Sequence, residues 1–177
     1  DSAVCVALRR RTDTRALIID GFGAAAEGAG TEYMAWMGHL PAMAATKLDR
    51  ALVICFGTGQ TANAVRTHHP KALDIVDVNP NVFRAARWFS TNEGVLSDPA
   101  VHPTVMDGRA YLRRTTNRYD VITLEPMPPN FAGTNSLYSK EFYELVRSRL
   151  APAGAVAQWV PFHLIAPDDM RAIVRSF

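Results

Sequence analysis

The chain has 177 residues, of which 48% are hydrophobic and 20% are charged, and its formal net charge is +2. This length and composition fit one globular domain with its own core and exclude a disordered chain. The small net charge gives no argument for nucleic-acid binding, the two cysteines are too few for a disulfide framework, and no apolar run reaches the roughly 20 residues of a membrane span.

Two short apolar runs at the start of the chain predict a β-hairpin. Residues 3–10 and 15–20 are rich in apolar and β-branched side chains, and the arginine-rich stretch between them is interpreted as a solvated turn rather than a basic binding patch. We expect residues 1–22 to form this hairpin, as the remnant of a small β-domain. Residues 23–177 then form the main domain, which we expect to be truncated at its C-terminal end.

The next segment predicts a loop followed by a helix. Residues 21–30 are rich in glycine and alanine without any periodicity, which predicts a mobile loop. Thr31 is a good N-cap for a helix whose apolar side chains recur at helical spacing. Because proline lacks a backbone N–H and clashes with the preceding turn, Pro41 is expected to kink or break this helix.

From residue 51 onward, short apolar runs alternate with helical patterns. The runs lie at 51–56, 73–78, 104–106, 121–124 and 155–160, and the helical patterns at 61–68, 82–89, 109–114, 140–150 and from 167 to the end. Buried strands alternating with helices predict an α/β fold with a parallel central sheet covered on both faces. Ligands of such sheets bind at the carboxyl ends of the strands, so the residues that follow each strand are the candidate site.

Glycines follow the first of these strands. Gly57, Thr58 and Gly59 open a G-x-G-x-x-A pattern between a strand and a helix, where the backbone can approach a ligand closely. A tight strand–helix turn without a ligand remains the alternative. Asp77 follows the second strand, about 20 residues later, where a carboxylate accepts hydrogen bonds from ribose hydroxyls. The alternative for Asp77 is a surface acid at a strand end.

Two further acids follow the third and fourth strands. Asp107 and Gly108 suit the amino group of an adenine, while Asp107 can also be the N-cap of the next helix. Glu125 opens a proline-rich loop at a position that faces a bound cofactor, where a carboxylate can be a general base. A structural acid bonded to the backbone is the alternative for Glu125. A dinucleotide and S-adenosylmethionine both fit these acids, but no second mononucleotide half remains in this length, so a sulfonium cofactor fits better.

These residues and their order resemble the spermidine synthases, or polyamine aminopropyltransferases. The similarity runs from about residue 17 to 164, and residues 125–159 especially resemble spermidine-synthase-like domains that bacteria fuse to membrane segments. The matching pieces are 19–21, 32–33, 39–41, 52–59, 76–80, 106–108, 119–122, 137–143 and Gln158.

The resemblance implies a Rossmann-like S-adenosylmethionine-dependent transferase fold preceded by a small β-domain. It also implies transfer of an aminopropyl group from decarboxylated S-adenosylmethionine to an amine acceptor, no metal and no nucleic acid. We further expect a homodimer that is cytoplasmic or lies at the cytoplasmic face of the membrane, with possible fusion to membrane segments outside this chain.

The resemblance also assigns roles to individual residues. The cofactor side consists of Gly57, Thr58, Gly59, Asp77, Val78, Asp107 and Gly108, and the substrate side of Tyr33, Met127, Tyr138 and Gln158. Glu125 falls on the family's catalytic aspartate and is the candidate base.

Some positions depart from the family pattern. Thr58 stands where the family has the aspartate that holds the aminopropyl ammonium, Pro128 replaces the second aspartate of the catalytic loop, and Met34 and Ala35 replace polar pocket residues. The adenosine side is therefore retained while the polycation side has lost its acids, which makes a diamine such as putrescine doubtful as the acceptor. Two alternatives stay open: methyl transfer from ordinary S-adenosylmethionine, and a non-catalytic nucleoside-binding module.

Overall fold

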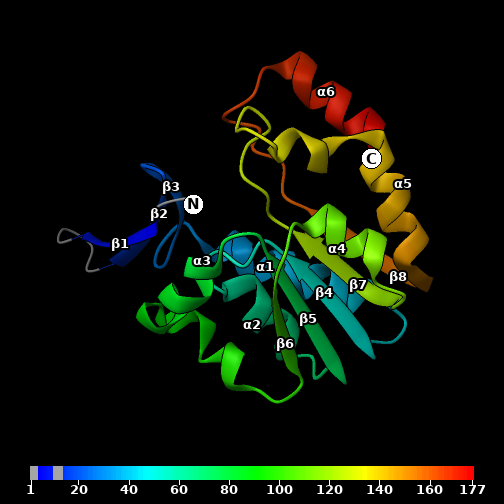
Figure 1. Ribbon diagram of the computed structural model, residues 1–177, viewed down its shortest axis with the longest axis horizontal. Helices are drawn as coiled ribbons and strands as arrows, with labels where there is room; N and C mark the ends of the chain where they lie inside the picture. The colour runs from blue at the N-terminus through cyan, green and yellow to red at the C-terminus, as the bar shows by residue number, and fades with distance from the viewer. Residues whose placement is uncertain (1–3, 10–13) are drawn as a thin grey trace.

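The computed structural model describes residues 4–9 and 14–177 and contains two sheets (Figure 1). A small antiparallel sheet has the strand order β1-β2-β3, and a larger sheet has the order β6-β5-β4-β7-β8. Every neighbouring pair in the larger sheet is parallel, which confirms the predicted fold class.

The small sheet contains the predicted hairpin and one unpredicted strand. Strands β1 (Val4–Arg9) and β2 (Thr14–Ile19) pair antiparallel, and β3 (Phe22–Ala26) pairs with the other edge of β2. The predicted turn between the first two strands lies mostly outside the described residues. The prediction of a mobile loop over 21–30 was wrong for β3. This strand is held by backbone hydrogen bonds to β2, and its glycine and alanine side chains form no pattern that would predict a strand.

Helix α1 (Glu32–Ala44) continues through Pro41, so the predicted break does not occur there. A proline at position 41 cannot donate to the carbonyl of Met37, four residues earlier. The hydroxyl of Thr123, on strand β7, donates to that carbonyl oxygen at 2.8 Å. The hydrogen bond that the proline removes from the helix is thus replaced by one from the sheet below.

The remaining elements follow the predicted alternation. The strands are β4 (Arg50–Ile54), β5 (Ala72–Asp77), β6 (Val101–Val105), β7 (Tyr119–Leu124) and β8 (Leu150–Gln158); the helices are α2 (Gln60–Arg66), α3 (Pro80–Ala85), α4 (Gly108–Arg114), α5 (Lys140–Arg149) and α6 (Pro167–Ser176). Short 3₁₀ turns lie at Ala86–Trp88, Ser90–Asn92, Val95–Ser97 and Thr134–Tyr138. Strand β8 begins at Leu150, earlier than the predicted start at residue 155. It includes an irregular segment around Ala153, whose φ is +60°.

Alternate residues of β4 face two separate cores. Ala51 and Val53 pack with side chains of α2, and Leu52 and Ile54 pack with side chains of α4 and α5. Because successive side chains of a strand point to opposite faces, this pattern places helices on both sides of the sheet. The central strands are held rigidly in this way, and so are the residues that follow them.

The C-terminal end of α6 approaches the start of α5 (Figure 1), and the rings of Tyr143 and Phe177 lie at a centroid distance of 5.1 Å. No helix in the described part of the chain is long and apolar enough to cross a membrane.

Candidate functional site

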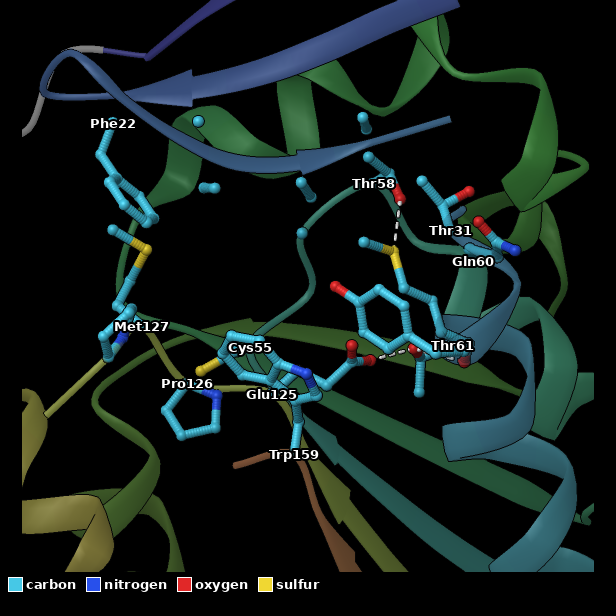
Figure 2. A pocket seen from close by; sticks show the side chains of 18 of the residues that line it. Phe22, Thr31, Cys55, Thr58, Gln60, Thr61, Glu125, Pro126, Met127 and Trp159 are labelled. Carbon is cyan, nitrogen blue, oxygen red and sulfur yellow. Dashed lines mark hydrogen bonds between the residues drawn. The ribbon is translucent and has the colours of Figure 1, made fainter. Parts of the chain in front are cut away.

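A cavity of about 640 Å³ lies between the two sheets. Its walls come from β3, the first turn of α1, the segments after β4 and β7, and the loop after β8. Figure 2 shows Phe22 and Met127 at one end of the cavity and Thr58 and Gln60 at the other, with Glu125 between them. The cavity lies at the carboxyl ends of β4 and β7, where the parallel-sheet rule places a ligand.

Glu125 is the first residue after β7 and lies largely buried in this cavity. Burial raises the pKa of its carboxyl from 4.5 to about 7, because the charged form loses hydration, while a hydrogen bond from Thr61 acts in the opposite direction. A carboxyl with a pKa near neutrality can accept and release a proton at physiological pH, which suits a general base.

The hydroxyl of Thr61 contacts both Glu125 and the backbone of α1. It lies in short hydrogen-bond contact with Oε1 of Glu125 and 2.8 Å from the carbonyl oxygen of Met34 (Figure 2). A threonine hydroxyl has one hydrogen to donate but can also accept one. When Glu125 is protonated, it can donate to Thr61 while Thr61 donates to Met34; when Glu125 is ionised, the hydroxyl can turn toward the carboxylate.

Two aromatic rings form the wall beside Glu125. Tyr33 and Trp159 stack with their ring centroids 6.2 Å apart and an angle of 23° between the planes. Burial, with a smaller contribution from the charge of Glu125, raises the pKa of Tyr33 to about 12. The phenol therefore stays neutral, and it can donate a hydrogen bond but not serve as a base at physiological pH.

The glycine loop after β4 has the conformation that its residues predict. Gly57 and Gly59 have φ values of +56° and +87°, in the left-handed region, and a Cβ on Gly59 would lie 2.6 Å from the ring of Phe56. The side chain of Thr58 is buried against the thioether of Met34, with 3.9 Å between Oγ1 and Sδ. Gly57 and Thr58 line the cavity, whereas Gly59 shapes the turn behind it.

Asp77 and Val78 lie outside the cavity walls. The carboxylate of Asp77 accepts hydrogen bonds from the backbone N–H groups of Phe56 and Asn79, both at 2.8 Å. Burial raises its pKa, and these two bonds partly offset that effect. Asp77 therefore braces the residue that precedes Gly57, and the side chain of Val78 is exposed.

Asp107 and Gly108 lie at the next strand end, also outside the cavity walls. The carboxylate of Asp107 accepts from the N–H of Ala110, so it is the N-cap of α4. A Cβ on Gly108 would lie 2.5 Å from Cγ2 of Ile54, so only glycine allows α4 to pack this closely on the sheet.

The predicted substrate-side residues divide into two groups. Tyr33 and Met127 line the cavity. Tyr138 is buried, and its hydroxyl lies 3.2 Å from the carbonyl oxygen of Met127 and 3.3 Å from that of Pro126, so it supports the loop from behind. Gln158 donates to the carbonyl of Leu137 at 3.3 Å and does not line the cavity.

Several cavity residues were not assigned to the site from the sequence, among them Phe22, Gln60, Thr61 and Trp159. Trp159 follows the last residue of β8, so the strand-end rule could have found it. Gln60 and Thr61 follow the glycine loop and could have been noted as its polar residues. The carbonyl oxygen of the Gln60 side chain is buried and has no hydrogen-bond partner among the described residues, which leaves an acceptor for a ligand N–H.

Comparison with known proteins gives the family context of this site. Residues 31–174 match the model of the spermine/spermidine synthase domain. The chain is 34% identical over 148 residues to polyamine aminopropyltransferase 2 of Pseudomonas aeruginosa, and 32% identical over 165 residues to the polyamine aminopropyltransferase of Nitrosomonas europaea. These matches cover 81% and 92% of this chain but only 42% and 50% of the relatives.

A solved structure shares the fold. A spermidine synthase crystallised in complex with the transition-state analogue AdoDATO superposes with a TM-score of 0.86 at 22% sequence identity, over 99% of this chain and 62% of that one. The chain thus spans about half the length of the curated relatives described above. The fold that it shares with the solved enzyme covers almost all of this chain.

Proposed function

The chain belongs to the spermine/spermidine synthase family, and from this premise we propose that it transfers the aminopropyl group of decarboxylated S-adenosylmethionine to an amine. The observation that carries the proposal is Glu125, a partly buried carboxyl with a pKa of about 7 at the end of β7, inside the cavity. The names of the relatives, which are polyamine aminopropyltransferases, support the same reaction class.

The cavity has features that fit the donor molecule. We propose that the glycine loop, with Asp77, Val78, Asp107 and Gly108 behind it, forms the nucleoside side of the site, as the resemblance implies. The unpaired side-chain oxygen of Gln60 can accept a hydrogen bond from the ammonium of the aminopropyl group, where the family has an aspartate in place of Thr58.

The proposed role of Glu125 follows from the chemistry of amines. An ammonium has no lone pair, so the acceptor nitrogen must lose a proton before it attacks the carbon beside the sulfonium. Glu125 is the carboxylate among the described residues of the cavity that can take this proton, and the rings of Tyr33 and Trp159 limit the directions from which an amine approaches it. Holding both reactants in one orientation supplies much of the remaining rate enhancement.

The test is the variant Glu125→Gln, which keeps the shape of the side chain and removes the base. We expect the rate of product formation to fall by about 10²- to 10⁴-fold, as for loss of a general base, while methylthioadenosine still raises the melting temperature. Glu32→Gln, at an exposed residue of the first turn of α1, is the matched control. Unchanged turnover in Glu125→Gln would exclude the proposed base.

One observation favours a second candidate, methyl transfer from ordinary S-adenosylmethionine. Thr58 and Thr31, which line the same end of the cavity, have neutral side chains that tolerate the carboxylate of that molecule, whereas an aspartate would repel it. Calorimetry with the two forms of the co-substrate distinguishes the candidates. Tighter binding of the decarboxylated form excludes the second one, and binding of either form without product from any amine favours a non-catalytic module.

We also propose a homodimer in the cytoplasm or at the cytoplasmic face of the membrane. Support for the dimer comes from α1, where Trp36, Leu40 and Met43 are 54%, 56% and 60% exposed along one side of the helix. Exposed apolar side chains at this spacing are typical of an interface. Sedimentation analysis of the wild type and of Leu40→Glu tests the dimer.

A further inference from the structure

The cavity offers a single carboxylate for cationic ligands. Among the described residues that line it, Glu125 is the only carboxylic acid. Glu27, at the end of β3, is already bound by Arg15 and by the backbone N–H of Ser90. Asp77 is bound by two backbone N–H groups, as described above. Both neighbouring acids already have protein partners, so we expect neither of them to bind the second ammonium of a ligand.

The walls around Glu125 are largely apolar. The stacked rings of Tyr33 and Trp159 and the side chains of Met34 and Met127 line the same cavity as its carboxyl, and the ring of His163, 6.3 Å from that of Trp159, adds an imidazole but no carboxylate. The polar end of the cavity consists of neutral groups, the hydroxyls of Thr31 and Thr58 and the amide of Gln60. A neutral hydrogen-bonding group can orient a cation but does not cancel its charge.

The cavity also hydrates charge poorly. Burial is the main reason why the pKa of Glu125 rises to about 7, so the surroundings disfavour even a single carboxylate. A buried ammonium without a carboxylate carries a larger penalty than a paired one. The proposed function uses Glu125 for the attacking nitrogen and Gln60 for the donor's ammonium, which leaves no group for a third cation.

We propose that the acceptor is a monoamine with an apolar carbon chain, and not a diamine. This inference rests on the proposed aminopropyl transfer. The neutral amine nitrogen uses its lone pair to form a bond to the carbon beside the sulfonium, and the carbon–sulfur bond breaks with its electron pair moving to sulfur. The products are a secondary ammonium and neutral methylthioadenosine, and Glu125 holds the proton that the acceptor nitrogen lost before the attack. The carbon chain of the amine packs against the aromatic and thioether walls.

The sharpest test compares two amines of nearly equal size. 1-Pentylamine and 1,4-diaminobutane differ mainly in that a methyl group replaces the second ammonium. We expect kcat/KM for pentylamine to exceed that for the diamine by about tenfold or more, because the second ammonium is left unpaired. An equal or higher kcat/KM for the diamine overturns the proposal while the proposed transfer stands.

Measuring the binding of the two amines tests the proposed monoamine site independently of catalysis. If neither amine gives product, the proposed transfer fails, and calorimetry on the protein loaded with methylthioadenosine still compares the two amines. Tighter binding of pentylamine supports the monoamine site even then. Equal binding, tighter binding of the diamine, or binding of neither overturns it.

Two variants that add a carboxylate test the cause of the selectivity. Met127→Glu, on the wall that the carbon chain of the acceptor would contact, is expected to raise the diamine-to-monoamine ratio of kcat/KM by about tenfold, whereas its uncharged counterpart Met127→Gln leaves the ratio near that of the wild type. Phe22→Glu, at the same end of the cavity as Met127, repeats the test at a second residue (Figure 2). A ratio that stays unchanged in a folded acidic variant contradicts the proposal.

Discussion

The hydroxyl of Thr61 lies between the carboxyl of Glu125 and the backbone carbonyl of Met34, and its hydrogen bond lowers the pKa of Glu125 against the larger effect of burial. Helix α2, which begins beside the glycine loop, thus holds the proposed base at the end of β7. The acidity of Glu125 depends on this contact as well as on its buried position.

Replacing Thr61 by valine should shift the pH dependence of the reaction. The variant keeps the shape of the side chain but removes the hydroxyl, so the pKa of Glu125 should rise further above 7. Since the base acts when deprotonated, the midpoint of the acidic limb of kcat/KM should move to higher pH by about one unit. Thr61→Ser, which retains the hydroxyl, should keep the wild-type midpoint. The same midpoint in all three proteins would show that Thr61 does not tune the base.

Glu125 should also make the stability of the protein depend on pH. Its folded-state pKa of about 7 lies above the ordinary value of 4.5, so the folded state favours the protonated carboxyl. The stability associated with protonation is fully present below pH 4.5 and is lost as the pH rises through 7, by about 3 kcal/mol in total. Urea unfolding of Glu125→Gln across this range should show a flatter dependence than the wild type. Parallel curves would contradict the raised pKa.

The hydrogen bond from Thr123 to the carbonyl of Met37 should stabilise the fold, because Pro41 has no backbone N–H to donate to that carbonyl. Thr123→Val should lower the free energy of unfolding by about 1 to 2 kcal/mol, the cost of a buried acceptor that loses its partner. Pro41→Ala restores a backbone donor in the helix, so the same valine substitution should cost less in that background. A double-mutant cycle in urea measures the difference, and equal costs in both backgrounds would refute the coupling.

Gly38 sets the distance between α1 and α2. A Cβ at this position would lie 2.6 Å from that of Ala64 and 2.7 Å from the carbonyl oxygen of Thr61. Gly38→Ala should therefore destabilise the protein by about 1 to 3 kcal/mol through overpacking, although alanine favours a helix. Gly23→Ala, where no heavy atom lies within 4 Å of the added group, is the control. A melting temperature for Gly38→Ala at or above that of the wild type would contradict this close contact.

The parallel sheet could be predicted because its signals are local. Buried strands read as continuous apolar runs, and helices such as α5 carry clear caps, with Ser139 accepting a hydrogen bond from the N–H of Phe142. Glu125 could be placed in the cavity because strand ends mark the expected site in this class of fold. These inferences need only the periodicity and the order of the elements.

The features that could not be predicted depend on contacts between distant segments. Strand β3 is defined by its pairing with β2, and its glycine and alanine residues carry no strand pattern. The helix through Pro41 depends on Thr123, which lies 82 positions later (123 − 41). Likewise, only the folded chain shows that Thr61 contacts Glu125, whereas Asp77 and Asp107 bind backbone N–H groups beside the cavity rather than lining it.

Strand β3 belongs to the small sheet and also forms one wall of the cavity, from Phe22 to Ala26. The width of the cavity is therefore fixed by how the small sheet is seated against the larger one. Substitutions in β1 or β2, far from Glu125 in the sequence, can change which ligands fit without touching the proposed base. In this chain, the size of the ligand that fits can evolve through the N-terminal strands while Glu125 at the end of β7 stays the same.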